Sequence, residues 1–199
     1  MGNRLSKIYT RTGDDGSTGM ADGSRVSKAD VLFSVMGDID ELNSHIGLVR
    51  AQLRQSKASS IETHVSDALV IIQHLLFNIG GELAMPEYEG VNTTHIEWLE
   101  QQIDTMNASL PPLKDFILPT GSVLVSQLHV ARSVCRRAER QAVLLLQQQR
   151  PEAIRSKAIS FINRLSDWLF VAARFCTDPS QVSEVLWDSQ VLQKFSDDT

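Results

Sequence analysis

Apolar residues recur at intervals of three and four along most of this chain. Two such series are Ile39, Leu42, Ile46, Val49 and Leu53, and Val65, Leu69, Ile72, Leu76, Ile79 and Leu83. Two further series are Ile96, Leu99, Ile103 and Met106, and Ala158, Phe161, Leu165, Trp168, Ala172 and Phe175. This spacing places the apolar side chains on one face of a helix. It predicts four amphipathic helices between about Ala29 and Cys176.

A fifth helix is predicted from about Ser122 to Gln149, where apolar residues lie on more than one side. They are Val123, Leu124, Leu128, Ala131, Val134, Ala138, Val143 and Leu146. A helix with so few polar faces is usually central to its bundle. The helices are separated by breakers at Gln55–Ser60, Met85–Asn92, Leu110–Gly121 and Arg150–Pro151. Of these, Pro151 suits the first turn of the last helix.

The chain contains no strand alternation that withstands inspection and no internal repeat. Alternating steps of three and four favour nearly antiparallel helices that cross at about 20°. The predicted fold is therefore an all-α bundle of about five long helices. The 199 residues suit a single domain. It is expected to comprise an arm (residues 1–29), the bundle (30–176) and a C-terminal extension (177–199).

Composition and charge exclude several classes of protein. Lys and Arg total 19 and Asp and Glu total 24, which gives a net charge of −5. A coat for nucleic acid or for an anionic membrane normally has a basic excess. No apolar run reaches the length of about 18 residues needed to span a bilayer. The N-terminus has no secretory signal, and Cys135 and Cys176 fit two reduced core thiols, so we expect a cytoplasmic protein.

Four arginines lie within nine residues of the fifth predicted helix, namely Arg132, Arg136, Arg137 and Arg140. At about 100° per residue, Arg132, Arg136 and Arg140 share one face. Glu139 offsets part of their mutual repulsion by pairing with Arg136. A solvated basic face is one interpretation, but the neighbouring residues are apolar on most sides. Buried guanidinium groups need anions, so a polyphosphate or a carboxylate of a partner is favoured.

The arm contains a stretch of glycines and hydroxyl residues, Thr10–Gly19, without helical periodicity. It is expected to be a loop, ordered alone or by a ligand. Its backbone N–H groups can converge on an anion, and Arg11 and Lys28 add positive charge. It lacks the GxxxxGK[ST] pattern of a P-loop. Together with the arginine helix, the arm indicates a nucleotide site.

Three other positions carry candidate chemistry. Asp40, at the edge of an apolar stripe, is a surface charge, a metal ligand or the partner of an arginine. The paired Glu-x-x-His motifs of a di-iron bundle are absent, so no metal site held by protein ligands is expected. Asn163, within an apolar helix, serves a hydrogen-bond network or a ligand. Phe116, in an apolar loop, caps the core or projects into a flat apolar pocket.

Six segments, in this order, resemble the PduO-type ATP:cob(I)alamin adenosyltransferases over residues 7–176. They are Tyr9–Thr18, Arg25–Lys28, Gly37–Asn43, Phe116–Gly121, Arg136–Arg140 and Asn163–Asp167. The resemblance implies a ferritin-like homotrimer of five-helix bundles with active sites at the subunit interfaces. It implies transfer of the 5′-deoxyadenosyl group of ATP to cob(I)alamin, which yields adenosylcobalamin and triphosphate. Implied partners are ATP with Mg²⁺, the corrinoid, a cob(II)alamin reductase and an adenosylcobalamin-dependent enzyme.

The same resemblance implies residue roles. ATP lies between the arm of one subunit and the arginine helix of its neighbour, and is bound by Thr10, Arg11, Thr12, Gly13, Thr18, Gly19, Lys28, Arg136, Arg137, Glu139, Arg140 and Asn163. The residues implied to act in catalysis are Arg136, Phe116, Asp40 and Arg132. Asp40 pairs with Arg132 across the interface and fixes the loop on the corrinoid side. Phe116 lies beneath the corrin ring and keeps the lower axial ligand off cobalt, which eases reduction to Co(I).

The chain departs from the family pattern at two places in the arm. Arg11 stands where Lys is common, and the segment Gly19–Gly23 differs from the usual sequence. Residues after Cys176 match no strong motif, although Trp187 or Phe195 are candidates to close over the corrin.

Two alternatives from other classes are a non-catalytic carrier of nucleotide or corrinoid and a purely structural trimer. In the structural trimer, the arginines would meet carboxylates across interfaces. Release of triphosphate separates the enzyme from a carrier, and calorimetric binding of ATP separates both from a structural trimer.

Overall fold

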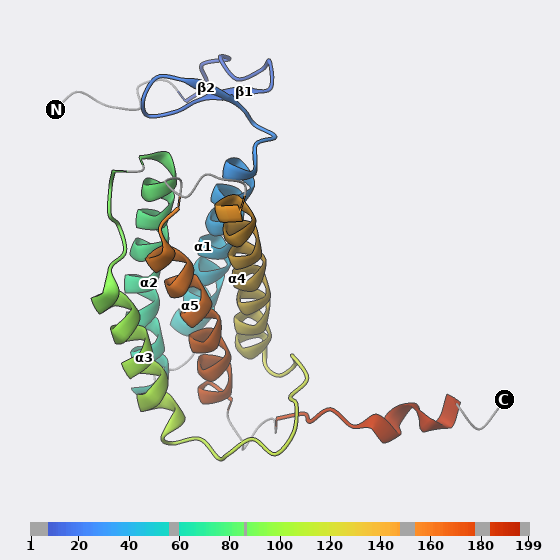
Figure 1. Ribbon diagram of the computed structural model, residues 1–199. Coiled ribbons are helices and arrows are strands. Elements are labelled where there is room, and N and C mark those ends of the chain that lie inside the picture. Colours follow the sequence, from blue (N-terminus) through green and yellow to red (C-terminus); the bar gives the residue numbers. More distant parts are fainter. Residues whose placement is uncertain (1–7, 56–59, 86, 148–153, 178–183, 196–199) are drawn as a thin grey trace.

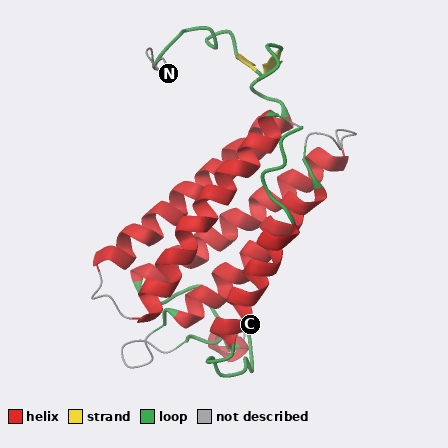
Figure 2. Ribbon diagram, turned by 90° about the vertical axis from the view of Figure 1, so that its left-hand side faces the viewer, coloured by secondary structure: helices red, strands yellow, loops and turns green. Residues whose placement is uncertain are grey.

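The computed structural model describes residues 8–55, 60–85, 87–147, 154–177 and 184–195. Within them, five long helices form the bundle: α1 (Val31–Gln55), α2 (Ser60–Ala84), α3 (Thr93–Asn107), α4 (Val123–Gln147) and α5 (Ser156–Phe175). They lie side by side with roughly parallel or antiparallel axes (Figures 1 and 2). The predicted all-α five-helix bundle is confirmed. The helices end close to the predicted breakers. Pro151 lies outside the described residues, and α5 begins at Ser156.

The predicted apolar stripes form the core. The stripes of α1 and α2 are completely buried, from Ile39 to Leu53 and from Val65 to Leu83. In α5, Phe161 and Trp168 are the bulkiest fully buried side chains. Among the described residues, no helix is both long and apolar enough to cross a membrane.

Helix α4 lies between α1 and α5, as its apolar composition predicts. Small side chains dominate its buried stripe, which includes Ala131, Cys135, Ala138 and Ala142. They allow close approach of the neighbouring helices, because the distance between helix axes depends on side-chain size at the contact. The outer surface of α4 is nevertheless exposed, and Val123, Val130 and Leu144 lie on it. One chain taken alone therefore places α4 centrally but leaves its outer surface uncovered.

The arm forms a small antiparallel hairpin where the sequence analysis predicted only a loop. Strands β1 (Ser17–Gly19) and β2 (Arg25–Ser27) pair with Thr18 opposite Val26. Each strand has three residues, which is too short for an alternating pattern to be recognised. Gly23 turns the chain between them with φ of +85°, a conformation that glycine adopts without strain. The arm projects beyond the N-terminal end of α1 (Figure 1).

The C-terminal segment, residues 184–195, leaves the opposite end of the bundle (Figure 1). Leu186 forms an isolated antiparallel bridge with Ile117 in the loop between α3 and α4. A 3₁₀ helix, η1 (Ser189–Phe195), follows and extends away from the helices.

Two adjacent isoleucines of α2 provide a matched test of this packing. Ile72 is fully buried, whereas Ile71 is 46% exposed. We expect Ile72→Ala to lower the free energy of unfolding by about 2–5 kcal/mol, because it removes buried methyl groups and leaves a cavity. Ile71→Ala is expected to cost less than about 1 kcal/mol. Urea unfolding at one fixed protein concentration measures both, and equal losses would contradict the assigned orientation of α2.

Candidate active site

Arg25 organises the arm. Its guanidinium donates to the carbonyl oxygen of Thr12 and to Ser17 Oγ, and lies 3.4 Å from Asp15 Oδ1. The backbone N–H and the hydroxyl of Ser17 also donate to Asp15, at 2.9 and 2.8 Å. Mainly because of these hydrogen bonds from Ser17, and with a further contribution from Arg25, the pKa of Asp15 is lowered from 3.8. The result is an ordered loop in which Thr10 and Thr12 share a hydrogen bond of 2.9 Å.

The Lys28 ammonium lies inside this loop and donates to the carbonyl oxygen of Gly13 at 2.7 Å. A Cβ atom at position 13 would stand 2.9 Å from Lys28 Nζ, so glycine is needed there to keep the ammonium in place. Arg11 has φ of +59°, unusual for a residue with a side chain, and its guanidinium lies 5.7 Å from the centroid of the Tyr9 ring. The predicted nucleotide-binding residues of the arm are thus close together.

Arg132, Arg136 and Arg140 share the outer surface of α4, hereafter the arginine face. Burial, with a contribution from the nearby Arg136, lowers the pKa of the half-buried Arg132, and its Nε is buried without a hydrogen-bond partner. Arg136 is exposed, and Arg140 donates to the backbone carbonyl of Arg136 at 3.0 Å. Among the described residues, none of the three makes an ion pair with a carboxylate. The arginine face therefore has uncompensated positive charge.

Arg137, one residue further on, is bound within the chain instead. Its Nε donates to Asp38 on α1 at 3.1 Å, and its terminal nitrogen donates to Glu41. The hydrogen bond that Arg137 donates to Asp38 is the main cause of its raised pKa. Arg137 therefore joins α4 to α1 and lies off the arginine face, as the helical spacing of the four arginines predicts.

Glu139 marks the other border of the arginine face. It accepts a hydrogen bond of 2.7 Å from Asn163 Nδ2 on α5, so the predicted pair with Arg136 is not the contact that orients it. The second carboxylate oxygen of Glu139 has no partner among the described residues. Asn163 is exposed and orients the Glu139 carboxylate through this one hydrogen bond, and its contact with a ligand stays a prediction.

Asp40 lies on the opposite side of α1, away from the arginine face. It lines a cavity of about 540 Å³ between α1 and α2, together with Phe33, Met36, Asn43, Phe77 and Gly80. No ion pair joins Asp40 to Arg132 within the described part of the chain. The apolar walls, and Phe77 with 79% of its surface exposed, leave this face of one chain uncovered.

Phe116 lies near the start of α4, in the loop formed by residues 111–122, hereafter the Phe116 loop. Its side chain is 80% exposed, so it does not cap the core. The second interpretation from the sequence, that the ring projects into a flat apolar pocket for a ligand, stays a prediction. Its backbone N–H donates to Asp115, and its carbonyl oxygen accepts from the backbone N–H of Trp187 at 2.7 Å. The backbone of Trp187 thus pairs with the backbone of Phe116.

Sequence reasoning missed three features of this region. Arg25 was not recognised as the centre of the arm, because its partners are up to thirteen residues away in the sequence. The cavity between α1 and α2 was not predicted, because it is formed only when the two helices pack side by side. Arg174, in α5, is 5% exposed and was overlooked, although a charge within an apolar helix is the same signal that identified Asn163.

Neither cysteine is suited to be a nucleophile. Burial raises the pKa of Cys135 strongly and that of Cys176 to about 12, so both are neutral thiols near pH 7. Within the described residues, no group of three or more His, Cys, Asp or Glu side chains is placed to hold a metal ion. The described side chains of the site therefore offer positive charge held in a fixed arrangement.

Known proteins match this chain along most of its length. A sequence profile of the family described as cobalamin adenosyltransferase matches residues 8–176. The cobalamin adenosyltransferase of Cupriavidus metallidurans is 45% identical over 190 residues, which cover 96% of this chain and 98% of that protein. The corrinoid adenosyltransferase of Bacillus subtilis is 41% identical over 189 residues, with 94% of each chain covered.

Solved structures agree with the sequence relatives. A variant PduO-type ATP:corrinoid adenosyltransferase from Lactobacillus reuteri, complexed with cobalamin and ATP, superposes with a TM-score of 0.82. It is 36% identical, and the match covers 92% of this chain and 97% of that one. A second variant from the same organism, complexed with ATP, gives a TM-score of 0.80 at 38% identity, covering 91% of this chain and 100% of that chain.

The assigned role of Arg25 is tested by Arg25→Gln. Without the guanidinium, we expect the backbone amides of Ser17 and Lys28 to exchange hydrogen about tenfold faster, since charge-assisted hydrogen bonds are lost. The amide of Leu76 in the core should be unaffected. In the unchanged protein, the amides of Ser17 and Lys28 should also lose protection as the pH falls below 3.8 through the lowered pKa of Asp15, because the protonated carboxyl is a weaker acceptor. Arg54→Gln, at the exposed end of α1, is the control. Unchanged exchange in Arg25→Gln would show that another contact orders the arm.

Proposed function

Because the chain belongs to the cobalamin adenosyltransferase family and catalyses ATP-dependent transfer of an adenosyl group to a corrinoid, we propose how its residues perform this reaction. The Co(I) centre of the substrate attacks the 5′ carbon of ATP. A cobalt–carbon bond forms with the electron pair of Co(I), and the bond from the 5′ carbon to oxygen breaks. Triphosphate leaves with that electron pair. The protein must therefore hold the 5′ carbon in line and stabilise the leaving anion.

The observation that carries this proposal is the uncompensated charge of the arginine face. Arg132 is half-buried with an unpaired Nε, and Arg136 has no carboxylate partner within the described residues. A triphosphate supplies the missing anion, and guanidinium groups bind phosphate oxygens through two parallel hydrogen bonds. Such groups contribute most to catalysis when they are aimed in advance at the developing charge. Arg136 and Arg140 are assigned to the triphosphate.

Glu139 and Asn163 are assigned to the nucleotide at the edge of the arginine face. Their hydrogen bond of 2.7 Å fixes the Glu139 carboxylate and leaves its second oxygen available. Mg²⁺ typically binds the phosphates of its nucleotide, several waters and one or two carboxylates. Glu139 is the carboxylate at this edge that fits such a role, and Mg²⁺ arrives with ATP as part of the substrate.

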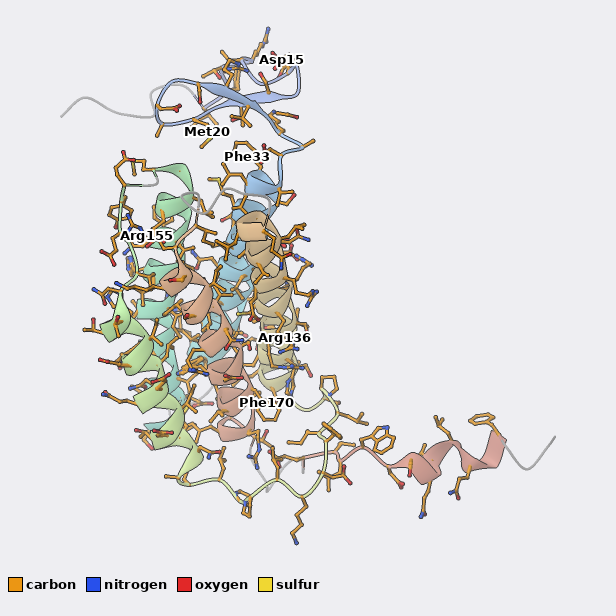
Figure 3. The ribbon with its side chains drawn as sticks, viewed as in Figure 1. Asp15, Met20, Phe33, Arg136, Arg155 and Phe170 are labelled. Atoms are coloured by element: carbon orange, nitrogen blue, oxygen red, sulfur yellow. The ribbon has the colours of Figure 1, made fainter. Side chains whose placement is uncertain are left out.

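The arm of a neighbouring subunit is assigned to the other side of ATP. In one chain the arm lies beyond the N-terminal end of α1, whereas Arg136 lies near the middle of α4, on the side of the bundle (Figures 1 and 3). A single subunit therefore does not bring its own Lys28 to its own Arg136. We assign Thr10, Arg11, Thr12, Gly13, Thr18, Gly19 and Lys28 to the ATP of the adjacent subunit in a homotrimer. Arg137 supports this site indirectly, by fixing α4 to α1.

The uncovered surfaces of one chain support the same assembly. The apolar cavity between α1 and α2 contains Asp40, and the outer surface of α4 presents Arg132, whose Nε is buried without a hydrogen-bond partner. Contact between these two faces would cover apolar surface and pair Asp40 with Arg132 of the next subunit. Buried arginine strongly favours such a partner.

Phe116 is assigned to the corrinoid. An exposed aromatic ring on a fixed backbone offers a flat apolar surface to the corrin and excludes a lower axial ligand from cobalt. A cob(II)alamin reductase is the implied source of the electron, and an adenosylcobalamin-dependent enzyme is the implied recipient of the product. Two free cysteines fit a cytoplasmic location.

Arg136→Lys tests the assignment of the leaving group. Lysine keeps the charge but loses the planar fork, so we expect kcat/KM to fall about 100-fold. The assay supplies ATP, Mg²⁺ and chemically reduced cobalamin and measures both adenosylcobalamin and triphosphate. Arg54→Lys is the matched control and should retain full activity. Full activity in Arg136→Lys would remove Arg136 from the site, and product without stoichiometric triphosphate would refute the proposed displacement.

Mixing two inactive variants tests whether subunits share the site. Lys28→Ala damages only the arm, and Arg136→Ala damages only the arginine face. In every heterotrimer of the two variants, about one of its three interfaces joins an intact arm to an intact arginine face. We therefore expect about a third of the native activity after co-expression with two different affinity tags and double purification, which removes the homotrimers. Activity no higher than in either parent would show that each site lies within one chain.

A further inference from the structure

Among the described residues, Arg174 is the most deeply buried arginine, and the proposed reaction does not use it. It lies in the last turn of α5, and its side chain is 4% exposed. Its Nε donates to Glu184 Oε1 at 2.7 Å, and its terminal nitrogen lies 3.4 Å from Glu184 Oε2. The same terminal nitrogen donates to the carbonyl oxygen of Pro111 at 2.8 Å. One guanidinium thus holds α5, the C-terminal segment and the start of the Phe116 loop.

Beyond Glu184, the chain pairs directly with the Phe116 loop. The N–H of Leu118 donates to Val185 at 2.8 Å, and the N–H of Trp187 donates to Phe116 at 2.7 Å. Ile117 and Leu186 form the bridge between these two contacts. A continuous series of bonds therefore leads from the Arg174 guanidinium to the backbone of Phe116.

The Phe116 loop has little other support. Residues 111–116 are all exposed, and Ile117 is only partly buried. At the other end of the loop, Gly121 enters α4 with φ of +149°, and a Cβ atom there would stand 2.8 Å from Val125 Cγ1, so glycine is needed at this position. The position of the Phe116 ring therefore depends on pairing with residues 185–187, and that pairing depends on Glu184.

We propose that Arg174 and Glu184 are positioning residues for the corrinoid site, acting through residues 185–187 on Phe116. This inference rests on the proposed contact between Phe116 and the corrin. A buried guanidinium without its carboxylate is strongly unfavourable, so loss of the Glu184 charge moves Arg174 and releases the C-terminal segment. The arginine face is more than one helical turn away from these contacts along α4, so ATP binding is unaffected.

Glu184→Gln is the principal variant, because it removes the charge and keeps the size of the side chain. We expect the KM for cob(I)alamin to rise about tenfold while the KM for ATP stays unchanged. In electron paramagnetic resonance of bound cob(II)alamin with ATP, the fraction that has lost its lower ligand should fall. Glu89→Gln is the matched control, since Glu89 pairs with Lys157 at 2.9 Å at the other end of α5. It should change neither KM nor the spectrum.

A double-mutant cycle with Phe116→Ala shows whether Glu184 acts through Phe116. We expect Glu184→Gln to have no further effect on the corrinoid KM or the spectrum once Phe116 is Ala. An equal effect in both backgrounds would overturn the proposal. So would a lowered melting temperature with an unchanged corrinoid KM and spectrum, which indicates a purely structural ion pair.

The proposed role of Phe116 can fail separately. If Phe116→Ala leaves the corrinoid KM and the spectrum unchanged, the assignment of Phe116 is wrong and the positioning proposal falls with it. If Phe116→Ala changes both and Glu184→Gln changes neither, only the positioning proposal is overturned.

Discussion

The packing of α4 between α1 and α5 is the constraint on which the rest of the structure depends. Small residues, including Ala131, Cys135 and Ala138, bury one stripe of α4 and draw its neighbours close. With the buried stripe fixed, the rotation of about 100° per residue determines every other direction on the helix. Arg137 then meets α1, Glu139 meets α5, and the arginine face between them points outward. The charge of the site is thus oriented by the core.

This arrangement suits a reaction in which the substrate supplies the nucleophile. Burial keeps both thiols neutral, so neither cysteine is suited to attack ATP. The protein's proposed contribution is an environment prepared for negative charge, since Arg132 and Arg136 have no carboxylate partner among the described residues. Leaving such charge uncompensated lowers the stability of one chain. In the proposed homotrimer, contact with a neighbouring subunit and binding of a triphosphate would both offset that cost.

The bundle could be predicted from the sequence because the residue pattern that identifies each helix lies within that helix. Steps of three and four residues identify each helix without knowledge of its neighbours, and the helix ends fall near Gly, Pro and polar stretches. The arginine face followed from the same geometry. What could not be predicted depends on partners distant in sequence, such as Arg137 with Asp38, 99 residues apart. The hairpin of the arm was missed because three-residue strands carry no detectable period.

Arg174 illustrates why the corrinoid side was harder to predict than the ATP side. Phosphate recognition requires guanidinium groups, which stand out in a sequence, whereas a flat apolar ligand requires only an exposed ring in a defined place. Other residues, which do not contact the ligand themselves, then hold that ring in position. A buried ion pair with a hydrogen bond to a loop carbonyl is a rigid way to do so, since one guanidinium binds a carboxylate and a backbone carbonyl at the same time. The C-terminal extension therefore contributes backbone pairing to the Phe116 loop and, through it, to the proposed corrinoid site, although no family motif marks it.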